Sequence, residues 1–347
     1  MTAAAAPLLW LRRLMTALIG VAAALLAYWL QVPLPFLLGP LAMSLVLALA
    51  GVPLAGPPSS WLNAVRTILG VAAGASVSPT LMQQLPQTLG SAALVPVFLA
   101  LAVLLGYPLF RWIAGFNSPT AFFATMPGGF AEMILFGSEK GGNIRALSLV
   151  HATRILTIVA VTPIALTFFL DVELSVAPGV PMRSVPPSDL LIMLFCAVAG
   201  YAIARRIRLF GAPVLGPMIL TAAVSLSGLI ENRPPSEALI LAQYVIGISI
   251  GAHYVGVTLD ELRRFVAASV AYSLVLGVLT IAFAEVVYRL GIAGRLDAVL
   301  AFAPGGQPEM VMLAILAGAD ITYVILHHVM RLVIVLAGMP LFVRVLR

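Results

Sequence analysis

Long apolar runs with few charged residues between them constrain the fold of this chain more than any other feature. Only 9% of the 347 residues are charged and 62% are hydrophobic, whereas about 25% of residues in a typical soluble domain are charged. A surface that faces lipid requires this scarcity, because each ionised group in the hydrocarbon costs several kcal/mol. The sequence therefore predicts an all-α polytopic membrane protein embedded in a lipid bilayer, with room for about ten to twelve spans of roughly 20 residues each.

The charged and metal-binding residues exclude other classes of protein. Of the 19 basic residues, 18 are arginines, which stand singly or in pairs at the ends of apolar runs rather than in a basic tail. Membrane topology therefore explains the net charge of +6, and we expect no nucleic-acid partner. The single cysteine, Cys196, excludes a disulfide framework, and the four histidines form no cluster with metal-ligand spacing. We expect neither a metal nor another cofactor.

A constant offset of 177 residues superimposes the two halves of the chain, which indicates a duplication. The strongest match is a Pro-Gly-Gly-x-x-Glu-Met block, followed at the same offset by a His-x-x-Arg pair. The matched residues are Pro127 with Pro304, Gly128 with Gly305, Gly129 with Gly306, Glu132 with Glu309, His151 with His328, and Arg154 with Arg331. The predicted repeats are residues 1–170 and 178–347, integrated in one membrane domain.

Each repeat contains six apolar stretches, and the topology depends on whether the fifth stretch crosses the membrane. In the first repeat they are residues 11–30, 36–50, 61–77, 90–112, 119–138 and 143–170. If the fifth stretch crosses, the repeats are parallel, with nine flanking basic residues inside and seven outside. If it enters and leaves on one side, the second repeat is inverted, with twelve inside and four outside. The positive-inside rule favours the inverted arrangement, in which the four outside are Arg183, Arg233, Arg289 and Arg295.

The Pro-Gly-Gly segments are expected to break their helices, because proline lacks an N–H group and glycine is a poor helix former. Such backbone at membrane depth must be buried in protein or line an aqueous cavity. Broken helices at matching places in two inverted halves indicate the binding site of a secondary transporter. We therefore predict two inverted repeats of five spans plus one broken or re-entrant helix each, about ten transmembrane helices, with both termini in the cytoplasm.

Glu132 and Glu309 follow the breaks by a few residues, at the start of the next half-helix. The positive end of a helix favours an anion there, and a carboxylate beside free backbone carbonyls suits coupling to H⁺ or Na⁺. The alternative is a structural role, in which each glutamate satisfies its own helix end or pairs with an arginine.

The sixth stretch begins with Asn143 in the first repeat and Asp320 in the second, both of which are good N-caps. At about 1.5 Å per residue, His151 lies roughly 12 Å and Arg154 roughly 16 Å into the membrane, near its middle. The spacing of three residues places both side chains on one helix face.

Ionisable groups at that depth require partners. We expect Arg154 to pair with Glu132 and Arg331 to pair with Glu309, either within or between repeats. The matching histidines, His151 and His328, either relay protons or donate to a backbone carbonyl.

Small residues predict where helices approach each other closely. Small-xxx-small spacing occurs at Gly70 and Gly74, and again at Gly247 and Gly251. We expect these contacts inside the fold, with a homodimer interface as the alternative. Leu-Gly-Pro at 38–40 and 215–217 predicts either further interrupted helices or ordinary proline kinks.

The segments MPGGFAEM with HATRIL, and APGGQPEM with HHVMRL, resemble the AbrB-type duplicated bacterial membrane protein family, which is also labelled ammonia monooxygenase. The resemblance covers nearly the whole chain and both repeats. It implies a protein of the bacterial inner membrane, and the family's labels mention regulation of gene expression. The residues support neither label, because a monooxygenase needs clustered metal ligands and a DNA-binding regulator needs a soluble basic module.

We therefore expect an ion-coupled secondary transporter or exporter of a small solute, not an enzyme, with its site at the two helix breaks near the membrane midplane. The alternatives are a membrane sensor that regulates gene expression indirectly and an oxidoreductase similar to ammonia monooxygenase. The solute could be an organic acid, an amphiphile or an ammonium-like cation.

Overall fold

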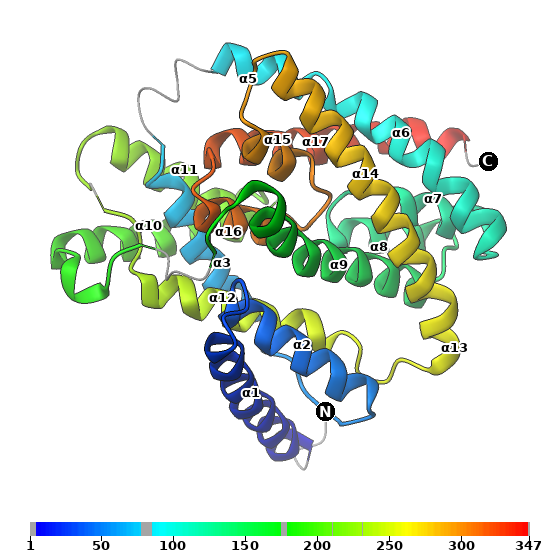
Figure 1. Cartoon of the computed structure of the whole chain (residues 1–347), viewed down its shortest axis with the longest axis horizontal. Helices are drawn as coiled ribbons and strands as arrows, with labels where there is room; N and C mark the ends of the chain where they lie inside the picture. The colour runs from blue at the N-terminus through cyan, green and yellow to red at the C-terminus, as the bar shows by residue number, and fades with distance from the viewer. Residues whose placement is uncertain (1–4, 78–84, 175–178, 210, 231, 346–347) are drawn as a thin grey trace. The chain divides into compact units, whose positions relative to one another are not determined.

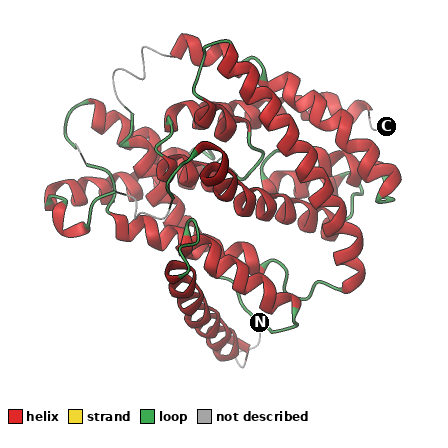
Figure 2. Cartoon of the chain, in the orientation of Figure 1, coloured by secondary structure: helices red, strands yellow, loops and turns green. Residues whose placement is uncertain are grey.

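The computed structural model describes residues 5–77, 85–174, 179–209, 211–230 and 232–345, and within these ranges it contains helices and loops but no strands (Figure 2). Two positions used in the topology prediction, the N-terminus and Arg347, lie outside the described residues, as does most of the link between the proposed repeats. Six helices in the described ranges are long and apolar enough to cross a membrane: Leu8–Trp29, Thr88–Ile113, Ile144–Leu170, Pro187–Arg206, Leu259–Arg289 and Ile321–Gly338. The chain is therefore an all-helical protein with the character of a multi-pass membrane protein.

Two compact units make up the chain, and each unit takes segments from both halves of the sequence. The first unit contains Met1–Gln83, Pro163–Gly256 and Val311–Thr322. The second contains Gln84–Thr162, Val257–Met310 and Tyr323–Arg347.

Helices of the first unit pack across the two halves of the sequence. They are α1 (Ala5–Trp29), α2 (Pro35–Leu49), α3 (Ser59–Gly74), α10 (Pro187–Arg206), α11 (Ala212–Leu226) and α12 (Ser236–Ala252). Helix α2 packs against α1 and α12, and α11 packs in the same way against α10 and α3 (Figure 1). Helices α2 and α11 are offset by 177 residues at both ends.

Four glycines allow these helices to approach closely, as their spacing predicts. A Cβ atom on Gly70 or Gly74 would overlap backbone carbonyl oxygens of α11, at Val214 and Met218. Gly247 meets the carbonyl oxygen of Leu37 in α2 in the same way, and Gly251 meets Leu41 and Ser44 of that helix. The expected packing inside the fold is confirmed at both sites.

The Leu-Gly-Pro segments do not interrupt their helices. Pro40 lies inside α2 and Pro217 lies inside α11. Of the two interpretations left open by the sequence, the structure therefore excludes interrupted helices.

The second unit contains the two broken helices. Its helices are α5 (Leu85–Ala92), α6 (Val95–Pro108), α7 (Ser118–Thr125), α8 (Phe130–Glu139), α13 (Leu259–Glu261), α14 (Ala267–Arg289) and α15 (Arg295–Phe302). Helices α9 (Ile144–Leu170), α16 (Gln307–Ala317) and α17 (Ile321–Val345) have residues in both units. Short non-α helical turns occupy Leu109–Ile113, Met182–Ser184 and Leu262–Val266. Within the second unit, α14 packs against α6 and α15.

Replacing Gly70 or Gly247 with alanine should destabilise the protein by about 1–3 kcal/mol, because the added methyl group would push apart two backbones that touch. Thermal unfolding in detergent measures the effect. Gly277→Ala in α14 is the matched control, since a Cβ there meets no atom within 4 Å. Equal unfolding temperatures for Gly70→Ala and Gly277→Ala would contradict close packing at α3.

Candidate functional site at the two helix breaks

Both Pro-Gly-Gly segments break their helices. Helix α7 ends at Thr125 and α8 begins at Phe130, so residues 126–129 connect two half-helices. The second break lies between Phe302 of α15 and Gln307 of α16. The offset of 177 residues relates α7 to α15 at both ends. The predicted breaks are confirmed, and both lie in the second unit.

Buried arginines hold the carbonyl groups left free at these breaks. Arg154, of which 1% is exposed, donates from Nη1 to the carbonyl of Met126 at 3.0 Å and from Nη2 to that of Gly128 at 3.5 Å. Arg331, of which 6% is exposed, donates in the same pattern to Ala303 at 3.0 Å and to Gly305 at 3.1 Å. These carbonyls follow the C-terminal ends of α7 and α15, where the helix dipole favours a cation.

The expected pairing of these arginines with Glu132 and Glu309 is wrong for this structure. The ion pairs among the described residues are Arg145 with Glu261, Arg289 with Glu285, and Arg295 with Glu285. The planar guanidinium group has donors spaced to bridge two carbonyl oxygens across a break. Backbone oxygens therefore replace the carboxylates as the partners of Arg154 and Arg331.

Each glutamate instead folds back onto the N-terminal end of its own half-helix. Glu132 is the third residue of α8, and its carboxylate occupies the place of a Cβ on Gly129. Glu309 is 6% exposed and lies against Gly306 in the same way. Only glycine leaves room for the carboxylate there, which gives Gly129 and Gly306 a second role besides breaking the helix. The positive helix end favours the anion at this position.

The two matching histidines have different surroundings. His328 contacts the carbonyl of Leu300 through Nε2 at 3.0 Å and the Arg331 guanidinium through Nδ1 at 3.0 Å. Because arginine only donates, Nδ1 of His328 accepts and Nε2 carries the proton. His151 is also fully buried, but neither of its ring nitrogens has a partner within hydrogen-bond distance in the described structure.

Helix α14 supplies two side chains that sequence reasoning missed. The Tyr272 hydroxyl donates to the carbonyl of Thr125 at 2.7 Å, and the Thr280 hydroxyl donates to that of Phe302 at 3.3 Å. The two carbonyls are equivalent positions at the ends of α7 and α15. A tyrosine and a threonine within a long apolar helix were the available signal, but the duplication did not indicate them because α14 serves both breaks.

A second buried polar group joins α5 to α17. Ser91 Oγ lies 3.0 Å from His327 Nε2, and Tyr323 donates to the same oxygen at 2.9 Å. His327 Nδ1 lies 2.8 Å from the carbonyl of Tyr323. These side chains are fully or almost fully buried, which gives His327 a structural partner set of its own.

The breaks therefore combine fixed charges with polar atoms that have no partner. The guanidinium groups of Arg154 and Arg331 are near enough for their charges to repel each other. Buried atoms without a hydrogen-bond partner in the described structure include Nε of Arg154, both ring nitrogens of His151, and Nε2 of Gln307 at the second break. Most buried polar groups are satisfied, so such a set favours a binding site over a purely structural motif.

Arg331→Lys should destabilise the protein by about 1–3 kcal/mol, because a lysine cannot bridge the two buried carbonyls and leaves one unpaired. Thermal unfolding in detergent tests this effect. Arg145→Lys is the control, since that side chain is 46% exposed in its ion pair and should cost less than about 1 kcal/mol. Equal losses in the two variants would mean that the bridge contributes nothing special.

Comparison with known proteins gives consistent relationships over most of the chain. The family described as "Transition state regulatory protein AbrB" matches residues 55–347. "Uncharacterized protein YhjN" of Bacillus subtilis (strain 168) is 27% identical over 302 residues, which cover 82% of this chain and 78% of the relative. "Putative regulator AbrB" of Escherichia coli (strain K12) is 25% identical over 320 residues, 90% of each chain. The match to the family covers both helix breaks, and the chain belongs to the AbrB family.

Proposed function

We propose that this protein is an ion-coupled secondary transporter or exporter of a small solute, with its binding site at the two helix breaks. The observation that carries the proposal is the pair of broken helices, each with a buried arginine on its free carbonyls and a glutamate at the following helix end. Discontinuous helices of this kind present backbone carbonyls and helix N-termini to ions and solutes in secondary transporters.

The glutamates are the proposed coupling groups. Neither Glu132 nor Glu309 is neutralised by Arg154 or Arg331 in this structure. A carboxylate beside a helix break can bind H⁺ or Na⁺ and release it when the surroundings change. Pro127, Gly128 and Gly129, with Pro304, Gly305 and Gly306, shape the backbone of the site, and His151 and His328 complete it.

The proposed architecture is two inverted repeats, residues 1–170 and 178–347, each with five crossings and one re-entrant broken helix. The recurrence of helix bounds at one offset supports a repeated unit. The excess of basic residues on one side supports the inverted orientation. We place both termini in the cytoplasm and the protein in the bacterial inner membrane.

This proposal makes the protein a transporter rather than an enzyme, with the bilayer and a small solute or ion as its partners and no nucleic acid. The names of the family and of the Escherichia coli relative refer to regulation. They favour, as the second candidate, a membrane sensor that affects gene expression indirectly. Solute flux distinguishes the two, because a sensor binds its ligand without moving it down or against a gradient.

Proteoliposomes that contain the parent protein should take up a solute only when a pH or Na⁺ gradient is imposed. The probes are radiolabelled organic acids and methylammonium, tested one at a time. Glu132→Gln and Glu309→Gln should each lose about tenfold or more of the gradient-driven uptake, because the amide cannot exchange a proton or bind a cation as a carboxylate does. Glu285→Gln, in a surface ion pair, is the control and should transport normally. Undiminished uptake in both test variants would rule out the glutamates as coupling groups.

The inverted topology is tested separately by labelling a cysteine after the first repeat. Glu173→Cys in a Cys196→Ala background should react with a membrane-impermeant maleimide from the periplasmic side of intact cells. Lys140→Cys should react only after the cells are opened, because the proposed topology places it in the cytoplasm. A cytoplasmic position for residue 173 would refute the five-crossing repeat.

A further inference from the structure

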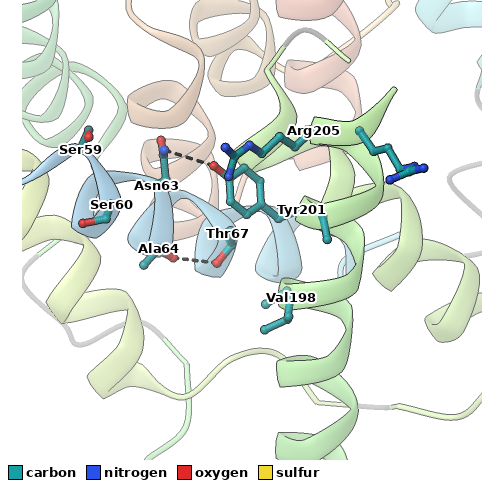
Figure 3. Close-up of a pocket in the computed structure, with 11 residues that line it drawn as sticks. Ser59, Ser60, Asn63, Ala64, Thr67, Val198, Tyr201 and Arg205 are labelled. Atoms are coloured by element: carbon teal, nitrogen blue, oxygen red, sulfur yellow. Dashed lines mark hydrogen bonds between the residues drawn. The ribbon is translucent and has the colours of Figure 1, made fainter. Parts of the chain in front are cut away.

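A polar pocket in the first unit lies apart from the residues assigned to transport. It has a volume of about 1100 Å³ and lies between the N-terminal half of α3 and the C-terminal half of α10 (Figure 3). Its polar lining consists of Ser59, Ser60, Asn63, Tyr201, Arg205 and Arg206. Figure 3 shows Asn63 reaching across to Tyr201, with a hydrogen bond of 3.3 Å between the amide nitrogen and the hydroxyl.

Two arginines give the pocket an uncompensated positive charge. Arg205 and Arg206 are exposed, and neither guanidinium group donates a hydrogen bond or forms an ion pair within the described part of the chain. Helix α3 contributes to the same field, because it begins at Ser59 after Pro58, which offers no capping side chain. The hydroxyl groups of Ser59 and Ser60 stand beside these charges. The chemistry suits an oxyanion such as a phosphate.

The surroundings indicate that this anion belongs to a lipid. Below Arg205 the outer face of α10 carries Leu191, Leu194, Phe195 and Val198, each more than 60% exposed. At the start of α3, Trp61 is 53% exposed and contacts Trp10, with 6.4 Å between ring centroids. Arg13 lies 5.1 Å from the centroid of the Trp10 ring. Exposed tryptophans beside arginines are typical of the membrane interface, where lipid headgroups lie.

The matching positions in the second half have the opposite character. The offset of 177 residues places Glu237 where the pocket has Ser60, and it relates Tyr28 and Trp29 to Arg205 and Arg206. The first unit is therefore basic at only one of its two equivalent ends. In the inverted arrangement proposed above, these ends lie in opposite leaflets, and the basic end lies in the cytoplasmic leaflet, whose surface is the negative one.

We propose that this pocket binds the phosphate headgroup of an anionic phospholipid, with Arg205, Arg206 and the first turn of α3 around the phosphate and the acyl chains along α10. The orientation relative to the cytoplasm rests on the proposed topology, but binding itself does not. The headgroup site and the transport site have no residue in common, so either assignment can fail alone.

Native mass spectrometry of the delipidated protein in detergent tests the proposal with phosphatidylglycerol as the probe. The parent should bind it and discriminate against phosphatidylcholine, whose headgroup has no net charge. The Arg205→Gln, Arg206→Gln double variant should bind about 30-fold more weakly, because each basic residue near an anionic lipid contributes about 1 kcal/mol. Both side chains are exposed, so the variant should fold normally.

Two further variants make the result specific. Arg183→Gln with Arg233→Gln removes the same charge from exposed positions elsewhere in the first unit and should leave binding unchanged. Ser60→Glu copies the residue found at the matching position and should abolish binding by repulsion, while the helix N-terminus favours the new acid. Transport by the parent need not be known for any of these measurements.

Three outcomes would overturn the proposal. One is a double variant at Arg205 and Arg206 that binds phosphatidylglycerol as well as the parent does. Another is an equal loss in the Arg183 and Arg233 control, which would indicate attraction by net charge alone. The third is inorganic phosphate that binds as tightly as the lipid and displaces it, which would assign the pocket to a free anion.

Discussion

The hydrogen bonds from two buried guanidinium groups to backbone carbonyls are the interactions on which this structure depends. A helix that stops inside a membrane leaves its last carbonyl groups without partners, and lipid cannot replace them. Arg154 and Arg331 each supply two parallel donors on a rigid plane, and each bridges the residues on either side of a proline. The same bonds give the buried charges their own compensation. The half-helices and the arginines therefore stabilise each other.

This arrangement separates the arginines from the glutamates. Each Arg is held at the C-terminal end of one half-helix, and each Glu lies at the N-terminal end of the next. Both positions agree with the helix dipole, so every charge is stabilised without forming an ion pair. A carboxylate that is not committed to an arginine is free to bind and release a coupling ion. The proposed transport mechanism follows from this separation.

Much of this arrangement could be predicted from the sequence. Pro-Gly-Gly predicted the position of each break, because the effect of proline and glycine on a helix is local. Asn143 was correctly predicted as an N-cap, and its side chain accepts from the N–H group of Ala146 at 3.0 Å. The duplication indicated which residues recur. The partner of Arg154 could not be predicted, because it is backbone, and every residue has a carbonyl whatever its side chain.

The differences between the two breaks were also beyond the sequence. Tyr272 and Thr280 come from one helix but serve both breaks, so no repeat pattern relates them. His328 has two partners, whereas His151 at the equivalent position has none in the described structure. These contacts depend on how α14 packs across the second unit. The duplication supplies the common geometry, and changes at single positions give each break its own chemistry.

Water access to the breaks tests the central claim most directly. In a Cys196→Ala background, cysteine at position 130 or 307, the first residue after each break, should react with a small membrane-impermeant thiol reagent in proteoliposomes. Val278→Cys is the control, because this residue is 68% exposed on an apolar helix and should face lipid, where a thiolate does not form. Reaction at both breaks but not at residue 278 is the predicted result. If neither break reacts while residue 278 behaves as expected, the breaks do not line an aqueous path and the transport assignment is wrong.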